Sequence, residues 1–489
     1  MTMDDRVELR LVGSPDRAYD APDEGLPPVA TANRAVPLLW PGLFDYEEAQ
    51  VRASGDLDLF TAVVPAKLAA ERAAAMEQAL PPDPPVLREC AHTLAFQLRQ
   101  APKGHHVVLF PEGVFLTLPP TSARAYLEQL FSLCSIWQRL RGGASWNELQ
   151  HDLDRVAPDV IRALKEQEAS VSGYYLVGSL VDRLNTLDEY LVRQGQEAAD
   201  QDPEALAVGE MGLMLGRFGG VWKLMSASTK QNLKAIWGGG GTLFVVGQAG
   251  TVVRVRKGRS VPVDVGTHAH LAGVWGLNPK FVCVLGEKGL VLVHDGNSWR
   301  PWSVPTRAPL HTMAGTSLES ICVAGQEVTI YRFDGHSWNP MQLPEEGMIS
   351  QLCNDDGTLV GVGGTRRGGA IYRLLRDGWS SDDQLPRVEW LEVAWKGWGV
   401  EFGVSAMEGP VLVRTASGWT YEPLPVERIT SVSAGSEVMA VGRRGGYEVI
   451  LSRKEQRWHV EASLVGLRLS SIWVAGRPKP PPLQPRAEG

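Results

Sequence analysis

Residue types suited to catalysis are present, but none of them stands at the spacing of a known active-site motif. The glycine run GGGGT at Gly238 lacks the lysine that a phosphate-binding GxxxxGK[ST] loop requires. No HExxH zinc motif occurs, and no GxSxG turn that would expose a nucleophilic serine. The sequence therefore predicts no catalytic residue, no metal site and no cofactor.

Neighbouring histidines and aspartates are the remaining candidates for metal or acid-base chemistry. Neither histidine pair has a cysteine or carboxylate companion at metal-ligand spacing, and a zinc site needs such companions. In a chain with 56 acidic residues, adjacent aspartates are more simply explained as turn formers. The pairs are His105-His106, His268 with His270, Asp355-Asp356 and Asp382-Asp383.

The elements that would have to position any site repeat along the second half of the chain. An apolar residue, here called the anchor, recurs at intervals of 38, 39, 39, 42, 38 and 40 residues. A period near 40 with strand-like content is typical of a β-propeller, in which each repeat is one four-stranded blade. The anchors are Leu233, Leu271, Leu310, Ile349, Leu391, Ile429 and Leu469.

Each repeat divides into four expected strands. The first ends in Trp or a small residue, and the second is a short apolar run closed by Gly, as in LFVVG and FVCVLG. The third is β-branched or alternating, as in TVVRV, and a polar turn with a Trp begins the fourth. We expect the tryptophans to be structural and to pack between blades, where each buries on the order of 200 Å². They are Trp237, Trp275, Trp299, Trp338, Trp379, Trp419, Trp458 and Trp473.

The two ends of the array indicate how it closes. Six complete repeats are followed by a seventh that begins at Leu469 and then runs into a Pro-rich tail. Upstream, GEMGLMLGRFGGVWKLMSAS aligns with the first repeat if its GxxG at Gly216 matches the GxxG at Gly247. We therefore predict seven blades, the last combining a C-terminal inner strand with strands from residues 210–230, because closure removes open sheet edges. The alternative is a six-bladed ring with a helix over 204–226.

The repeat motifs resemble those of known bacterial propellers. IWGGGGTLFVVGQAGTVVRV, DGNSW and DGHSW are similar to sequences in propellers with sialidase-type (BNR) repeats and in photosystem II assembly-factor propellers. The resemblance covers residues 208–475 and implies the propeller fold. Sialidases carry an Asp-box, S-x-D-x-G-x-T-W, of which this chain keeps only the ends, so no sialidase site residue is carried over. The other members imply an assembly or binding platform.

The part before the repeats is predicted to be a mainly helical α+β domain. It follows an arm that is irregular apart from one strand candidate, VELRLVG, and its core is expected to include AVPLLWPGLF. Amphipathic patterns predict helices within 64–100, 121–142 and 144–194. The segment HHVVLFPEGVFLTLPP predicts a hairpin that turns at its Pro-Glu-Gly.

These elements predict two folded domains with flanking segments. The predicted organisation is an irregular N-terminal arm (1–35), a mainly helical α+β domain (36–200), a linker (201–208), a seven-bladed β-propeller (209–476) and a Pro-rich disordered tail (477–489).

Charge is shared unevenly between the two domains. Residues 1–205 hold 18 Lys and Arg against 31 Asp and Glu, a net charge of -13, whereas the remainder holds 30 against 25, a net charge of +5. In a propeller the turns between second and third strands lie on one face. We predict that basic residues there bind an acidic protein surface, either the chain's own helical domain or a separate partner. The alternative is that they are solvated turn residues without a partner. They are Arg217, Lys288, Arg366, Arg367, Arg443 and Arg444.

Composition bounds the compartment and the partners. The five cysteines show no CxxC spacing, so they are expected to be free thiols, mostly buried, rather than disulfides or metal ligands. The opening MTMDDRVELR lacks the features of a signal peptide, and no apolar run approaches the ~18 residues of a membrane helix. A bacterial cytoplasm is therefore predicted. The net charge of -8 argues against nucleic acid as a ligand.

Two classes of function follow from these observations. The first is a non-catalytic protein-protein interaction or scaffold protein, such as an accessory or immunity-like component of a bacterial assembly or conflict system. The second is a sialidase-, glycosidase- or lyase-like enzyme with its site in the central depression of the propeller. Acidic, basic and tyrosine side chains converging on that depression would favour an enzyme, and small or apolar residues there would favour a platform. The sequence makes no prediction of oligomeric state.

Overall fold

The computed structural model describes residues 6–12, 30–33, 39–54, 57–80, 85–99, 101, 103–110, 120–156, 201–326, 328–382, 384–397, 401–406, 409–444, 447–464 and 468–476. Contacts divide the chain into two compact units. The first contains 1–196 and the short segments 445–448 and 462–467, and the second contains the rest of 197–489. The helices expected over 157–194, the second half of the expected hairpin and the Pro-rich tail lie outside the described residues.

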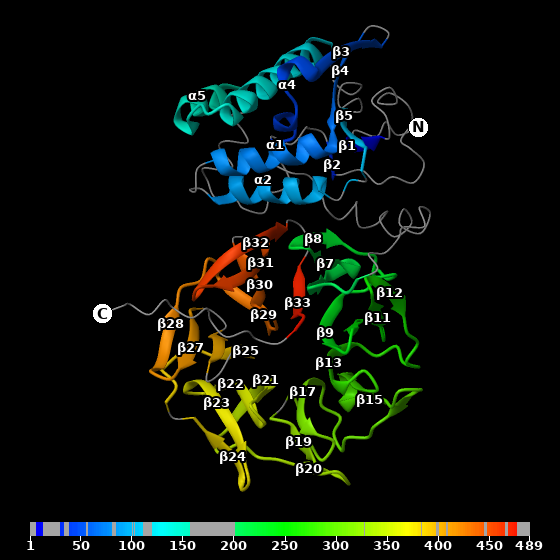
Figure 1. Ribbon diagram of the computed structural model, residues 1–489, viewed down its shortest axis with the longest axis vertical. Helices are drawn as coiled ribbons and strands as arrows, with labels where there is room; N and C mark the ends of the chain where they lie inside the picture. The colour runs from blue at the N-terminus through cyan, green and yellow to red at the C-terminus, as the bar shows by residue number, and fades with distance from the viewer. Residues whose placement is uncertain are drawn as a thin grey trace, which may run out of the picture. The chain divides into compact units, whose positions relative to one another are not determined.

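The first unit contains a five-stranded antiparallel sheet in the order β2-β1-β5-β4-β3 together with α-helices (Figure 1). The strands are β1 (Arg6–Val12), β2 (Ala30–Asn33), β3 (Ala49–Ser54), β4 (Leu57–Pro65) and β5 (His106–Phe110). The described helices are α1 (Ala66–Ala79), α2 (Pro85–Leu98), α4 (Pro120–Arg141) and α5 (Trp146–Val156). All four fall where the apolar period predicted helices.

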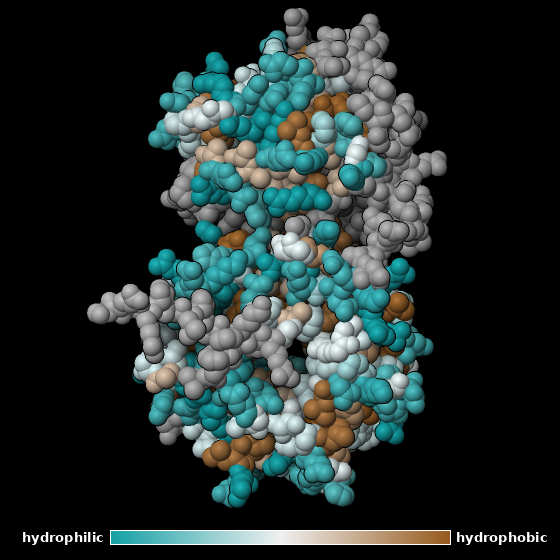
Figure 2. Space-filling model, in the orientation of Figure 1, coloured by the Kyte–Doolittle hydropathy of each residue, from teal (hydrophilic) through white to brown (hydrophobic). Residues whose placement is uncertain are grey.

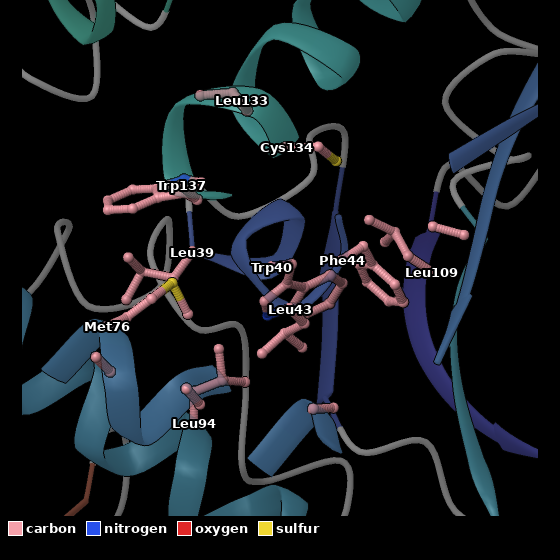
Figure 3. Packing of buried hydrophobic residues seen from close by; sticks show 14 of the residues in the cluster. Leu39, Trp40, Leu43, Phe44, Met76, Leu94, Leu109, Leu133, Cys134 and Trp137 are labelled. Carbon is pink, nitrogen blue, oxygen red and sulfur yellow. The ribbon is translucent and has the colours of Figure 1, made fainter. Parts of the chain in front are cut away.

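The segment predicted to belong to the core forms the short 3-10 helix η2 (Trp40–Leu43), which lies at the centre of this unit. Figure 3 shows Trp40 and Phe44 among side chains from the helices and from β5. A Cβ added at Gly42 would come within 2.3 Å of Met76 Sδ and 3.1 Å of the Trp137 ring. Only glycine therefore allows η2 to approach α1 and α4 this closely.

Two parts of this sheet differ from the expectation. Residues 1–35 were expected to be an irregular arm, but β1 pairs with both β2 and β5 and so lies inside the sheet. The hairpin of β3 and β4 was not predicted at all. The alternation of apolar and polar residues in these strands is short, and β4 leads directly into the Ala-rich helix α1. The helical period of α1 therefore masked the strand pattern before it.

The second unit is a seven-bladed β-propeller, as predicted. It consists of seven four-stranded sheets with antiparallel pairing, drawn in Figure 1 as a ring. The first six sheets, blades 1 to 6, each use four consecutive strands. Blade 7 has the order β33-β6-β7-β8, so its inner strand comes from the C-terminal end of the array and its other strands from the N-terminal end. Trp473 of β33 pairs with Leu206 of β6.

Blade 1 consists of β9 (Leu233–Gly239), β10 (Thr242–Gly247), β11 (Val252–Arg256) and β12 (Arg259–Pro262). Blade 2 consists of β13 (Leu271–Asn278), β14 (Phe281–Gly286), β15 (Val291–His294) and β16 (Trp299–Pro301). Blade 3 consists of β17 (Leu310–Ser317), β18 (Ser320–Gly325), β19 (Ile330–Phe333) and β20 (Trp338–Pro340).

The strands of blades 4 to 7 are β21 (Gly347–Asp355), β22 (Thr358–Thr365), β23 (Gly368–Leu375) and β24 (Gly378–Ser381); β25 (Leu391–Lys396), β26 (Phe402–Ala406), β27 (Val411–Thr415) and β28 (Gly418–Glu422); β29 (Arg428–Ala434), β30 (Val438–Arg444), β31 (Tyr447–Lys454) and β32 (Arg457–Leu464); and β33 (Leu469–Val474), β6 (Ala205–Gly209), β7 (Met214–Phe218) and β8 (Val221–Leu224).

The register assigned to blade 7 from the sequence was wrong by seven residues. Leu469 pairs with Gly209 as Leu233 pairs with Gly247, so Gly209, not Gly216, corresponds to Gly247. Two GxxG pairs follow each other in this segment, at Gly209 and at Gly216. Both match the spacing of the GxxG at Gly247, so the spacing alone does not distinguish the two alignments. With the corrected register, β6 begins at Ala205, inside the segment expected to be a linker.

The Trp-Gly pairs at the ends of inner strands join one blade to the next. A Cβ at Gly238 of blade 1 would lie 2.5 Å from the Trp473 ring of blade 7. Likewise, a Cβ at Gly276 would lie 3.0 Å from Trp237, and one at Gly315 would lie 2.7 Å from Trp275. Each glycine therefore leaves room for the indole of the preceding blade, including at the closure of the ring.

A second contact repeats between the outer strands, and we call it the staple. It joins the residue three positions after the fourth-strand Trp of one blade to the residue five positions before the fourth-strand Trp of the next. Between blades 5 and 6 it is a bidentate ion pair, in which Arg453 donates to the two Glu422 oxygens at 2.7 and 2.6 Å. Both side chains are over nine-tenths buried, and Trp458 Nε1 also donates to Glu422.

The same positions hold other pairs elsewhere in the ring. Between blades 4 and 5 Arg414 donates to Asp382 at 3.1 Å, and between blades 6 and 7 Arg217 lies 3.7 Å from Glu461. Between blades 2 and 3 the staple is aromatic, with the Trp302 and Phe333 ring centroids 4.7 Å apart. Between blades 3 and 4 Met341 and Leu374 occupy these positions and pack on one apolar cluster.

Blades 4 and 5 share a further cluster of charges around Asp355. Its carboxylate accepts from Lys396 at 2.7 Å, from Arg373 at 2.8 Å and from Arg414 at 3.2 Å, and the side chain is 7 % exposed. Burial alone would raise the pKa of Asp355, but hydrogen bonds from Lys396 and Arg373 outweigh it and leave the pKa below its usual value. Asp355 and Asp382, expected to be turn formers, therefore hold two blades together.

Exchanging the staple between blades 5 and 6 tests whether its two residues act as a unit. Glu422→Met leaves the buried Arg453 with only Glu401, so we expect a loss of about 3 kcal/mol in stability. Glu422→Met with Arg453→Leu reproduces the Met341-Leu374 pair and should recover most of that loss. Urea unfolding followed by tryptophan fluorescence measures both. A double variant as unstable as the single one would show that the pair is not interchangeable.

The lowered pKa of Asp355 predicts a pH dependence. Because the folded pKa is lower than the unfolded value of about 3.9, the cluster stabilises the fold above that pH. The stabilisation is lost as the pH falls through the folded value. Asp355→Asn should therefore lower the melting temperature at pH 7 and lose less stability in acid than the parent. Asp377→Asn, at an exposed residue in the turn between β23 and β24, is the control. Parallel pH profiles for parent and Asp355→Asn would contradict this account.

Candidate binding surface

The six basic residues predicted to line one face occupy three kinds of position. Lys288 lies in the turn between β14 and β15 with φ 56°, and its side chain is exposed. Arg366 and Arg367 form the turn between β22 and β23 and are exposed. Arg443 and Arg444 end β30 and are half-buried. These five therefore lie at or beside turns between second and third strands, as predicted.

Arg217 does not lie in such a turn. It lies on β7, where its guanidinium pairs with Glu437 and Glu461 of blade 6, and only 12 % of its side chain is exposed. The shifted register explains the error, because the turn residue of blade 7 that corresponds to Lys288 is Met211, with φ 52°. Arg217 is therefore structural and not a candidate for partner binding.

Arg366 and Arg367 line a groove between blades 4 and 5, which we call the blade 4–5 groove. It has a volume of about 670 Å³. One wall is the β22-β23 turn and the other is the chain that leads into β25. A third arginine, Arg387, adds to the rim, and Tyr421 of β28 adds a side chain that is 57 % exposed. Its lining is Thr365, Arg366, Arg367, Gly368, Arg387, Val388, Glu389, Trp390, Ala406, Pro410 and Tyr421.

Hydrogen bonds and close packing fix the walls of this groove. Trp390 Nε1 donates to Ser350 Oγ at 2.6 Å, and a Cβ at Gly364 would lie 2.6 Å from the indole. The Arg367 amide donates to Thr365 Oγ1 at 3.0 Å, which holds the turn. The Gly369 amide donates to the Val388 carbonyl at 2.9 Å, which joins the two walls. The groove is therefore pre-formed, and little ordering is needed before a ligand enters.

Positive charge predominates at the rim of the groove. Three arginines and one acid, Glu389, line it, and all four side chains are exposed. Arg366 pairs with Glu346 at 3.3 Å, but the two side chains are 85 % and 71 % exposed. Such a pair contributes about 0.2–1 kcal/mol at most and can give way to a ligand. The rim is therefore suited to anionic groups.

The central depression of the propeller has a mixed lining. Five of its residues directly follow an anchor on an inner strand, and Gln248, Gln326 and Glu287 come from turns between second and third strands. It has a volume of about 560 Å³ and includes no tyrosine. The five inner-strand residues are Lys234, Ala272, His311, Thr430 and Ser470.

Two histidines line this depression, and the backbone engages one nitrogen of each ring. His270 Nδ1 accepts from the Ala249 amide at 2.9 Å, and His311 Nε2 lies 3.1 Å from the Ile349 carbonyl. Burial lowers the pKa of His311, against a smaller opposing effect of its backbone hydrogen bond, so this ring is neutral at pH 7. Acidic and basic groups therefore share the depression, but tyrosine does not join them.

The remaining sequence candidates for phosphate binding, metal binding or thiol chemistry do not form a functional site in the described residues. Gly240 and Gly241 form the turn between β9 and β10, with φ 54° and 70°, so GGGGT is a strand turn as predicted. Within the part of the chain that the structure describes, no three His, Cys, Asp or Glu residues gather as metal ligands, and no helix is long and apolar enough to cross a membrane.

Burial raises the pKa of Cys134 and Cys322 to about 12. These thiols are therefore protonated and unreactive.

Comparisons with known proteins bear on the fold. No protein-family model and no curated protein matches the chain. Among solved structures, YCF48 from Cyanidioschyzon merolae is 13% identical with a TM-score of 0.42, and covers 52% of this chain and 93% of its own. The WD40 propeller domain of Doa1 is 14% identical with a TM-score of 0.44, and covers 53% and 93%.

A third similar structure is catalytically inactive virginiamycin B lyase from Staphylococcus aureus with quinupristin. It is 13% identical with a TM-score of 0.41, and covers 47% of this chain and 84% of its own. The seven four-stranded sheets of the ring themselves confirm the propeller fold that the repeat motifs implied. At these identities the similarity concerns architecture alone.

The packing of Trp390 predicts the effect of a methyl group at Gly364. Gly364→Ala must displace the indole, so we expect a loss of about 1–3 kcal/mol in stability and of the bond to Ser350. The Trp390 indole proton signal in nuclear magnetic resonance, assigned with Trp390→Phe, reports that bond. Ser350→Ala removes the bond without the clash and is the matched control. An unchanged indole signal in Gly364→Ala would contradict the described packing.

Proposed function

We propose that this chain is a non-catalytic protein-protein interaction protein whose propeller presents the face of the second-to-third-strand turns to a protein partner. The observation that carries the proposal is the blade 4–5 groove, where three exposed arginines and an exposed tyrosine surround a pre-formed hollow. Arginine and tyrosine are enriched at the centres of protein interfaces. A rigid backbone lowers the entropy cost of binding there.

The charge of this face supports an acidic partner. Lys288, Arg366 and Arg367 are exposed, and Arg443 and Arg444 lie at the corresponding edge of blade 6. Long-range attraction between such a face and an acidic surface speeds association and disfavours basic competitors. In this proposal the protein acts in a bacterial cytoplasm as an accessory component of an assembly or conflict system.

A sialidase-, glycosidase- or lyase-like activity in the central depression is the second candidate. Lys234, Glu287, His270 and His311 favour it, because acid-base chemistry needs such groups near one another. Against it, no tyrosine lines the depression, and most polar side chains around the histidines are amides and hydroxyls, which do not titrate near pH 7. The interaction function therefore has the stronger support.

Charge reversal on the proposed face tests the interaction function. The full chain is immobilised, and bound proteins are recovered from a native bacterial lysate at low and at physiological salt. We expect a specific partner whose capture weakens with salt. Reversing Arg366, Arg367, Arg443 and Arg444 to Glu should reduce its capture by at least about tenfold.

Reversal of Arg256 and Arg259, two exposed arginines on the outer strands of blade 1, is the control and should leave capture unchanged. Capture that is equal for the face variant, the control and the parent would exclude this face as the interaction surface. Turnover of a sugar or ester substrate by the purified chain, abolished by His270→Ala, would favour the second candidate instead.

A further inference from the structure

The blade 4–5 groove combines apolar lining residues, here called its floor, with three exposed arginines at its rim. Val388, Ala406 and Pro410 line it together with Trp390. Figure 2 shows that hydrophilic residues predominate over one face of the propeller and that hydrophobic residues form separate small patches there. The groove therefore brings several apolar side chains together with three arginines.

An extended peptide can offer both kinds of group that this groove is suited to bind. In an extended chain successive side chains point in opposite directions, so every second residue faces the same side. One set of side chains can enter the apolar floor while its neighbours reach the rim. Carboxylates suit the rim, because a guanidinium binds a carboxylate through two parallel hydrogen bonds.

Building on the proposed function, we infer that the blade 4–5 groove binds an extended acidic segment of a partner protein, with Asp or Glu side chains on Arg366, Arg367 and Arg387 and an apolar side chain against Trp390. A groove of about 670 Å³ has room for only a few residues of such a segment. The arginines at the rim make the site selective for acidic side chains. The apolar floor adds a surface from which water is displaced when an apolar side chain binds.

A nucleic acid fits the same groove less well. Glu389 lines the rim and Glu346 lies 3.3 Å from Arg366, so a continuous phosphate backbone would meet two carboxylates as well as three arginines. Protein surfaces that bind nucleic acid also carry a wider field of positive charge, and this chain has a net charge of -8. A peptide can place its carboxylates only where the arginines lie.

Fluorescence anisotropy with the full chain tests this inference. The probe is a labelled octapeptide library. Every second position is Asp or Glu, and each position between them is randomised over the other amino acids. Matched probes carry Asn or Gln at the alternate positions, and a single-stranded oligothymidine serves as the nucleic-acid competitor. We expect the acidic library to bind at least about tenfold more tightly than the neutral one, and oligothymidine not to displace it.

Variants locate the site. Arg366→Glu with Arg367→Glu should weaken acidic-library binding by at least about tenfold, and Tyr421→Ser should weaken it less. Arg256→Glu with Arg259→Glu changes the charge equally elsewhere and should bind as the parent does. Unchanged melting temperatures keep the comparison independent of folding.

Three results would overturn the inference: no preference for the acidic library, binding that survives reversal of Arg366 and Arg367, or tighter binding of oligothymidine through the same arginines. The proposed function has a separate outcome. If Arg443→Glu with Arg444→Glu still abolishes partner capture while the groove fails to bind the library, the interaction face stands and the groove is not its peptide site.

Discussion

Each blade of the propeller is held to the next by residues that fit across the gap between them, and the rest of the second unit depends on that fit. At the three junctions from blade 7 to blade 3 an inner-strand indole lies over a glycine of the following blade, and one of these contacts joins Trp473 to Gly238 where the ring closes. Farther out, the staple adds ion pairs on one side of the ring and apolar pairs on the other. Because closure uses strands from both ends of the array, no blade in the ring lacks a neighbour.

This constraint explains where the candidate site lies. The blade 4–5 groove forms between two blades that also share the Asp382-Arg414 staple and the buried Asp355 cluster. Those charged contacts fix the distance between the blades, and so the separation between the β22-β23 turn and the strand entrance that carries Trp390. The exposed arginines of the rim are not part of this network, because the buried Asp382 pairs with Arg373 and Arg414 instead. Structural and exposed charges are therefore separate sets in this protein.

The repeat period was sufficient to predict seven blades, the closing strand and the structural tryptophans. It was insufficient to fix the register of blade 7, since two GxxG pairs follow each other there and only the pairing of Leu469 with Gly209 distinguishes them. That error placed Arg217 in a turn. The correct register also adds Trp222 of β8 to the series of fourth-strand tryptophans. In the first unit, the strand candidate in VELRLVG was found, but its partners are distant in sequence and no local pattern specifies them.

The staple could have been found from the sequence and was not. An acid three residues after one repeat tryptophan and an arginine five residues before the next recur in successive blades, as Asp382 with Arg414 and Glu422 with Arg453. The pattern is not visible within one repeat, because its two members belong to different blades. By contrast, the groove could not be predicted, since Trp390 and Tyr421 meet the β22-β23 turn only through the three-dimensional arrangement of two blades.

Amide hydrogen exchange tests most directly whether the ring behaves as one closed unit. Ile472→Asp places a charge at a buried position of β33 and should prevent this strand from completing blade 7. If closure holds the whole ring, the protected amides of all seven blades will exchange faster by a similar factor, including those of β18 and β22. Faster exchange confined to β6, β7 and β8 would contradict this account and show that the blades are stable independently of closure.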